Sequence, residues 1–277
     1  MEKDFLFNKS WFVTKEVVSG VLAIREPHHF EDALSFFISG TDQSVLIDTG
    51  MGLANIKDCL PEGNEPIVLL THSHWDHIGG AREFNTVMIS DESFEKERLE
   101  KGWEPYEMTG FNHDDFIIPT PRDFRPDFFR IPGMSGFSTV HDGDRFDTGG
   151  DNILAIHTPG HTPGSLCFFL EGAGFLFTGD TLYPGPEYLH LPESDHDQYC
   201  KSLYRLRREF YSRIKRIFPG HNAYSTSTAL LLDHIAAIEG KLSCIDQKRG
   251  RDFFGEFVER KYAGFTLRRS AEADKKP

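Results

Sequence analysis

The segment Thr71–His77 constrains the fold more than any other part of the sequence. It places three histidines and one aspartate within six positions. It follows the apolar run 67–70, which predicts a buried strand. Because side chains alternate sides in extended chain, His72 and His74 are expected to point the same way. The Asp76 side chain is expected to point to the same side as these two, and the His77 side chain to the opposite side. We therefore expect the first pair to hold one metal ion and the second pair to face another.

Further candidate ligands follow other apolar runs along the chain. The run 153–156 leads to His161, the run 174–177 leads to Asp180, and the run 214–218 leads to His221. In open α/β sheets, ligands gather at the carboxyl ends of the strands. Each of these segments alone is a weak signal, because a buried, hydrogen-bonded histidine is the more ordinary interpretation. Together with the end of the run 67–70, they make four strand ends with candidate ligands, and four in one chain predict a shared metal site.

This pattern resembles the ligand set of the metallo-β-lactamase-fold hydrolases, and Asp48-Thr49-Gly50 is similar to an early motif of the same family. The resemblance covers roughly residues 10 to 240. It implies an α/β fold of four layers (αββα), in which two β-sheets are flanked by helices. It also implies two metal sites: His72, His74 and His161 hold the first ion, Asp76, His77 and His221 hold the second, and Asp180 bridges both.

Imidazole and carboxylate ligands suit zinc first, and iron or manganese as alternatives. Two divalent ions activate water as a metal-bound hydroxide and polarise the bond to be cleaved. Asp76 is the expected catalytic aspartate, because it anchors the second ion and orients that hydroxide. Tyr183 is expected to stabilise the oxyanion, although tyrosine also packs at strand ends. Asp48 is expected to hydrogen-bond the ligand loop and not the metal, with a simple capping role as the alternative.

Charge and length bound the remaining possibilities. The 277 residues are 39% hydrophobic, enough for one large α/β domain spanning 1–277, and the formal net charge is −13. This charge argues against nucleic acid as a partner. The basic residues from about 245 onward are interpreted as a solvated helix face and a tail. The sequence shows no export signal and no apolar run of membrane-spanning length, so a cytoplasmic enzyme is expected.

Local patterns predict the order of the elements. A meander of strands is expected over 11–50, followed by a short helix at 54–60 and a charged helix at 91–101, solvated on most faces. Later strands are expected near 152–157, 165–170, 174–178 and 214–218. Two more helices are expected near 195–210 and 225–243.

The segment 102–139 is the least regular part of the chain and is interpreted as a loop insertion. Its aromatic content argues against disorder, and loops of this length are usually functional. We expect it to form an apolar wall for a hydrophobic substrate, with a packed phenylalanine cluster or a dimer contact as alternatives. The candidate substrate-binding residues are Phe111, Phe116, Phe128, Phe129 and, as a proton shuttle in a later loop, His190.

These features favour a dinuclear metal-dependent hydrolase of a thioester, a lactone or a related acyl compound. Its partner would be a small acyl molecule, and homodimer formation stays open. A phosphodiesterase or nuclease of the same fold is the alternative, disfavoured by charge. An iron-dependent redox member is a further alternative.

Overall fold

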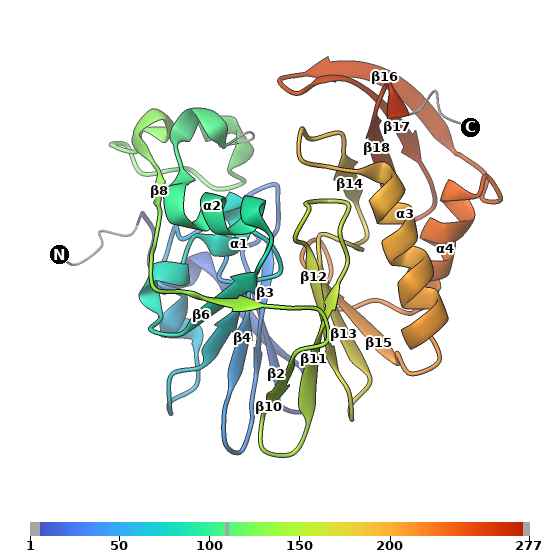
Figure 1. Ribbon diagram of the computed structural model, residues 1–277. Coiled ribbons are helices and arrows are strands. Elements are labelled where there is room, and N and C mark those ends of the chain that lie inside the picture. Colours follow the sequence, from blue (N-terminus) through green and yellow to red (C-terminus); the bar gives the residue numbers. More distant parts are fainter. Residues whose placement is uncertain (1–5, 109–110, 274–277) are drawn as a thin grey trace. The chain divides into compact units, whose positions relative to one another are not determined.

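A computed structural model describes residues 6–108 and 111–273. The chain divides into two compact units (Figure 1). Unit 1 comprises Met1–Val140 and Phe146–Asn152, and unit 2 comprises His141–Arg145 and Ile153–Pro277. Among the described residues, no helix has the length and apolar character needed to cross a membrane.

Unit 1 is built on a mixed seven-stranded sheet of order β1-β2-β3-β4-β5-β6-β9. Neighbours pair antiparallel from β1 to β4 and parallel from β4 to β9. The central strands are buried along their whole length, as expected for continuous apolar runs. The strands are β1 (Val13–Val18), β2 (Val21–Arg25), β3 (Leu34–Ile38), β4 (Val45–Ile47), β5 (Ile67–Leu69), β6 (Val87–Ser90) and β9 (Ser138–Val140).

Helices α1 (Trp75–Ile78) and α2 (Ser93–Lys101) share one hydrophobic core with this sheet. Ile78 of α1 and Leu99 of α2 belong to the same buried cluster as Leu46 of β4 and Val68 of β5. The short helix predicted at 54–60 is a 3-10 turn, Ile56–Cys59. This core fixes the direction in which the chain leaves β5.

The described part of the 102–139 segment is folded. Strands β7 (Gly102–Trp103) and β8 (Ile131–Pro132) pair antiparallel, and three 3-10 turns lie between them (Pro105–Glu107, His113–Asp115 and Pro126–Phe128). A bridge between His29 and Phe116 ties the segment to the early loop after β2.

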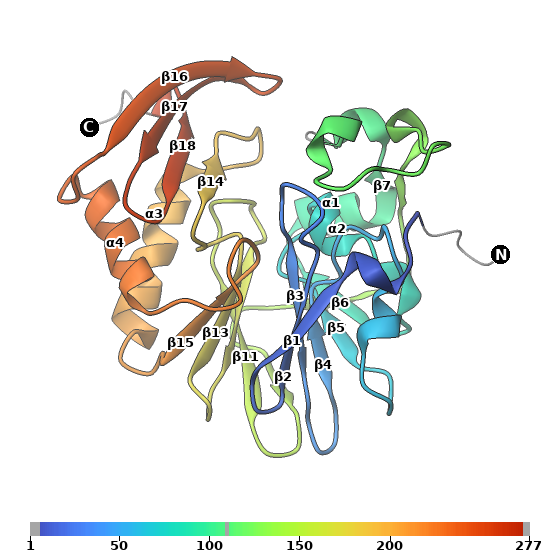
Figure 2. The same ribbon diagram turned by 180° about the vertical axis from the view of Figure 1, so that it is seen from behind.

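A second mixed sheet, of order β10-β11-β12-β13-β15, contributes Arg145 of β10, Ile153–His157 of β11 and the whole of β12, β13 and β15 to unit 2. Helices α3 (His196–Arg205) and α4 (Ala229–Ile238) lie side by side in both views (Figures 1 and 2). Their apolar residues, such as Leu203 and Leu231, share a core with Ile156 and Leu176 of the sheet. The strands are β10 (Arg145–Asp147), β11 (Asn152–His157), β12 (Leu166–Leu170), β13 (Phe175–Gly179) and β15 (Arg216–Pro219).

The predicted bounds of the last helix were too wide. At its start, Thr226 pairs with Ile217 in an isolated bridge, and the helix begins only after it, at Ala229. At its end, Gly240 has a φ of 67°, which stops a right-handed helix. The predicted helix over 195–210 corresponds to α3 followed by a π-helical turn, Leu206–Phe210.

The prediction of a helix face and a tail after residue 245 was wrong. The described residues form strands β16 (Asp246–Asp252), β17 (Gly255–Lys261) and β18 (Thr266–Ser270), which join β14 (Pro186–Leu189) in a sheet of order β14-β18-β17-β16. Their charges pair across the strands: Arg268 of β18 donates to Glu259 of β17 at 2.9 and 2.7 Å. Such cross-strand pairs stabilise this sheet, although its many charged residues suggested a solvent-exposed helix face and tail.

Candidate metal centre

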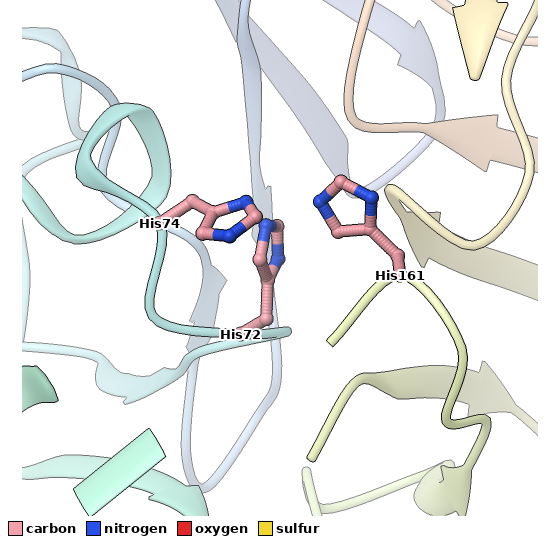
Figure 3. A group of neighbouring side chains, drawn as sticks. All are labelled: His72, His74 and His161. Carbon is pink, nitrogen blue, oxygen red and sulfur yellow. The ribbon is translucent and has the colours of Figure 1, made fainter. Parts of the chain in front are cut away.

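The loop after β5 and the short helix α1 that follows it carry four predicted ligands in unit 1. The ring centroids of His72 and His74 lie 4.6 Å apart, and those of His72 and His77 lie 4.2 Å apart. A carboxyl oxygen of Asp76 lies 3.7 Å from Nε2 of His77. All four side chains are buried. Figure 3 draws His72 and His74 on this loop, and His161 on the loop that follows β11.

Asp48 organises this loop by three hydrogen bonds. Its carboxyl accepts from the backbone N–H and the hydroxyl of Thr71, both at 2.8 Å, and from Nδ1 of His77 at 2.8 Å. Donation from Nδ1 leaves the lone pair of His77 on Nε2, the atom that a metal would bind. The expected contact of Asp48 with the ligand loop is therefore present in the structure.

Glu95 was missed by the sequence reasoning, which treated its helix as solvated on most faces. Its side chain is 0% exposed, and it accepts hydrogen bonds from the backbone N–H (2.8 Å) and the hydroxyl (2.5 Å) of Ser73. The indole Nε1 of Trp103 donates to the carbonyl of the same serine at 2.8 Å. Ser73 is thus held from both sides between His72 and His74. A single acidic residue in a charged helix gives no signal of such a role.

Glu26 is a second buried carboxyl that the sequence did not reveal. Burial raises its pKa to about 8, although hydrogen bonds from the Met51 N–H and the Trp11 indole, both at 2.9 Å, partly oppose the shift. A Cβ atom at Gly50 would come within 2.8 Å of this carboxyl. Glu26 therefore packs against the Asp48-Thr49-Gly50 turn and holds its end through the hydrogen bond from Met51.

Unit 2 gathers the three remaining predicted ligands at the ends of its strands. His161 follows β11, Asp180 follows β13 and His221 follows β15. The Asp180 carboxyl oxygens lie 3.5 Å from Nε2 of His161 and 3.0 Å from Nε2 of His221. Nδ1 of His161 donates to the carbonyl of Tyr188 at 3.0 Å, which directs Nε2 toward Asp180.

Tyr183 lies beside this second cluster. Its ring centroid is 5.1 Å from that of His221, and its hydroxyl donates to the carbonyl of Pro186. Its backbone N–H donates to Glu187 at 2.8 Å. Burial raises the pKa of the Glu187 carboxyl well above its ordinary value, and the nearby Asp180 adds to that effect. Glu187 is thus a third buried carboxyl that shapes the chain around the predicted ligands.

The candidate substrate residues differ in their surroundings. His190 is buried, donates to Asp252 at 2.7 Å, and has Phe254 and Phe257 as ring neighbours. Phe111 and Phe116 are buried in an aromatic cluster, and Phe129 is partly buried against the same core. Phe128 is 81% exposed.

The family can be decided by comparison with known proteins. The sequence model of the metallo-β-lactamase superfamily matches residues 30–221. The chain belongs to this superfamily. The resemblance inferred from the sequence is therefore confirmed, and the residues that carried it lie at the strand ends of two mixed sheets.

Two curated relatives are similar over most of the chain. The acyl-coenzyme A thioesterase MBLAC2 of Gallus gallus is 31% identical over 227 residues, which are 76% of this chain and 80% of that protein. The human protein of the same name is 29% identical over 230 residues, with 76% and 81% coverage.

The solved structures support the fold alone. A metallo-β-lactamase superfamily protein from Sulfolobus tokodaii is 20% identical, with a TM-score of 0.59, covering 82% of this chain and 88% of that one. The sec-alkylsulfatase Pisa1 from Pseudomonas is 16% identical, with a TM-score of 0.59, covering 81% and 41%. The predicted α/β fold class is confirmed.

Proposed function

We propose that the two ligand clusters act together as a site for two divalent metal ions. In this proposal His72, His74 and His161 would hold one ion, Asp76, His77 and His221 would hold the other, and Asp180 would serve both. Potential ligand atoms lie within 4.8 Å of one another in each of three groups: His72, His74 and His161; His72, His77 and Asp180; and Asp76, His77 and His221. The donor set supports this proposal, because buried imidazoles and carboxylates are typical ligands of zinc. Membership of a metal-dependent superfamily supports it independently.

The function that we propose is hydrolysis of a thioester, with an acyl-coenzyme A as the first substrate class. The observation that carries this proposal is the similarity to acyl-coenzyme A thioesterases over most of both chains. A net charge of −13 supports a small substrate and disfavours the nuclease alternative, because phosphate chains are bound by basic surfaces.

When bound, the two ions would lower the pKa of water and polarise the carbonyl oxygen of the substrate. Asp76 would orient the attacking water, and Asp48 and Glu95 would keep the ligand loop in place. We propose that Tyr183 helps to stabilise the oxyanion. To do so, its hydroxyl must exchange its hydrogen bond to Pro186 for one to the substrate.

The proposal is tested with a substrate panel on the metal-loaded protein: acyl-coenzyme A thioesters, a lactone, a β-lactam and a phosphodiester. We expect cleavage of the thioesters, and loss of about two orders of magnitude or more in kcat for Asp76→Asn. Turnover of the phosphodiester alone would refute the proposal, as would full activity of Asp76→Asn. Elemental analysis of the purified protein separates zinc from iron and so tests the redox alternative.

A further inference from the structure

We propose that a cavity in unit 1 binds the hydrocarbon chain of the acyl group. This inference rests on the proposed thioesterase function and specifies where the substrate chain lies. The cavity has a volume of about 720 Å³, within the range of small-molecule sites. Its apolar lining comes from two facing 3-10 turns and the chain between them: Pro105, Tyr106, Met108, Phe111, Pro126 and Phe128.

The residues on the floor of the cavity are buried, and the aromatic residues on its rim are exposed. On the floor, Met108 and Phe111 are buried. The Phe111 ring stacks on Phe129 at 4.7 Å and meets Phe124 edge-on at 5.9 Å. On the rim, Tyr106 is 75% exposed and Phe128 is 81% exposed. Large exposed aromatic side chains beside a preformed apolar floor gain most when an apolar ligand covers them.

The cavity adjoins the loop that carries the predicted ligands. Phe111 on its floor meets the ring of Trp75 edge-on at 5.5 Å, and Trp75 directly follows His74. On another side, Glu104 of the lining follows Trp103, whose indole donates to Ser73. Both tryptophans are buried, so a substrate whose carbonyl lies at this loop would extend its chain past them, toward the side of the cavity that Phe111 lines.

The charges that line the cavity favour the acyl chain of the substrate over its coenzyme A nucleotide. Glu104 and Asp127 both line the cavity, against the single cation Arg130. Two carboxyl groups disfavour the phosphates of a nucleotide, whereas they do not oppose a neutral hydrocarbon chain. The geometry and the charge therefore favour the acyl chain over the coenzyme A end.

The test is the dependence of KM on chain length in the metal-loaded enzyme, from butanoyl- to hexadecanoyl-coenzyme A. Each methylene that enters the cavity should lower KM roughly fourfold until the cavity is full. Phe128→Ser and Tyr106→Ser should raise KM about tenfold for the long thioesters and much less for the butanoyl thioester. Ile117→Ser is the matched control, because Ile117 is a 69% exposed residue of the same segment that does not line the cavity.

Binding of 1-decanol, followed by the fluorescence change of the tryptophans, separates this inference from the proposed function. Weaker binding in Phe128→Ser than in Ile117→Ser supports the cavity even if no thioester is cleaved. Thioester cleavage with equal KM effects on short and long chains, or with equal decanol binding in the two variants, would overturn the inference while the thioesterase proposal stands. Weaker inhibition by free coenzyme A in Phe128→Ser would also overturn it, in favour of the nucleotide end.

Discussion

Replacing Glu26 by glutamine should remove a pH dependence from the stability of the fold. The Glu26 side chain is 1% exposed, and burial raises its pKa from 4.5 to about 8. In the unfolded chain the carboxyl returns to its ordinary pKa. Between these two values only the folded state binds the proton. The stability linked to this proton is therefore fully present below about pH 4.5 and is lost as the pH rises through about 8.

The magnitude follows from the displacement of the pKa. A shift from 4.5 to about 8 corresponds to roughly 5 kcal/mol, because each tenfold change is worth about 1.4 kcal/mol. This is a large share of the total stability of a typical domain, about 5–15 kcal/mol. The unfolding free energy of the wild-type protein should fall by most of that amount between about pH 5 and pH 9.

The assay is urea unfolding at several pH values, followed by tryptophan fluorescence, with a chelator present throughout so that ion binding does not contribute. The decline in the Glu26→Gln variant should be smaller than in the wild type by most of this roughly 5 kcal/mol, whereas the part due to the buried Glu187 carboxyl should remain. Glu62→Gln removes an exposed carboxyl and should keep the wild-type decline. Parallel curves for wild type and Glu26→Gln would show that this carboxyl is ionised in the folded protein, and the reasoning would fail.

Three further changes test the environment of the ligand loop. Asp48→Asn weakens the hydrogen bond that orients His77 and should reduce zinc affinity about 10- to 100-fold in a chelator competition, whereas unchanged affinity would contradict the role of Asp48. Gly50→Ala places a Cβ within 2.8 Å of Glu26 at a φ of 67° and should destabilise the protein by at least about 1–2 kcal/mol in urea. Glu95→Ala leaves the serine between the first two histidines without its acceptor and should lower the thermal midpoint by roughly 5 °C or more; an unchanged midpoint would argue against that contact.

Continuous apolar runs were the part of the fold that the sequence predicted best. The runs at 34–38, 45–47 and 67–69 correspond to β3, β4 and β5. A strand buried on both faces needs an apolar residue at nearly every position, which leaves a clear pattern. The same pattern marks where each strand ends, and so it also located the clusters of candidate ligands.

The charged strands after residue 245 could not be recognised in the same way. Their stability comes from pairs such as Glu259 and Arg268, which lie nine positions apart in sequence and meet only when the strands align. The buried carboxyls of Glu26, Glu95 and Glu187 were missed for a related reason. Each is buried by distant parts of the chain, and an isolated glutamate looks like surface in the sequence.

The sheet formed by β14 and the C-terminal strands supports one of the predicted ligands, although it contains none of them. Strand β14 carries Glu187 and Tyr188, and its parallel partner in the sheet is β18, residues 266–270. The family match ends at residue 221. Strand β18 thus pairs with the strand whose Tyr188 carbonyl aligns His161. Cutting the chain after residue 221 would leave every predicted ligand in the sequence, yet it would remove the strand that pairs with the backbone holding His161 in orientation.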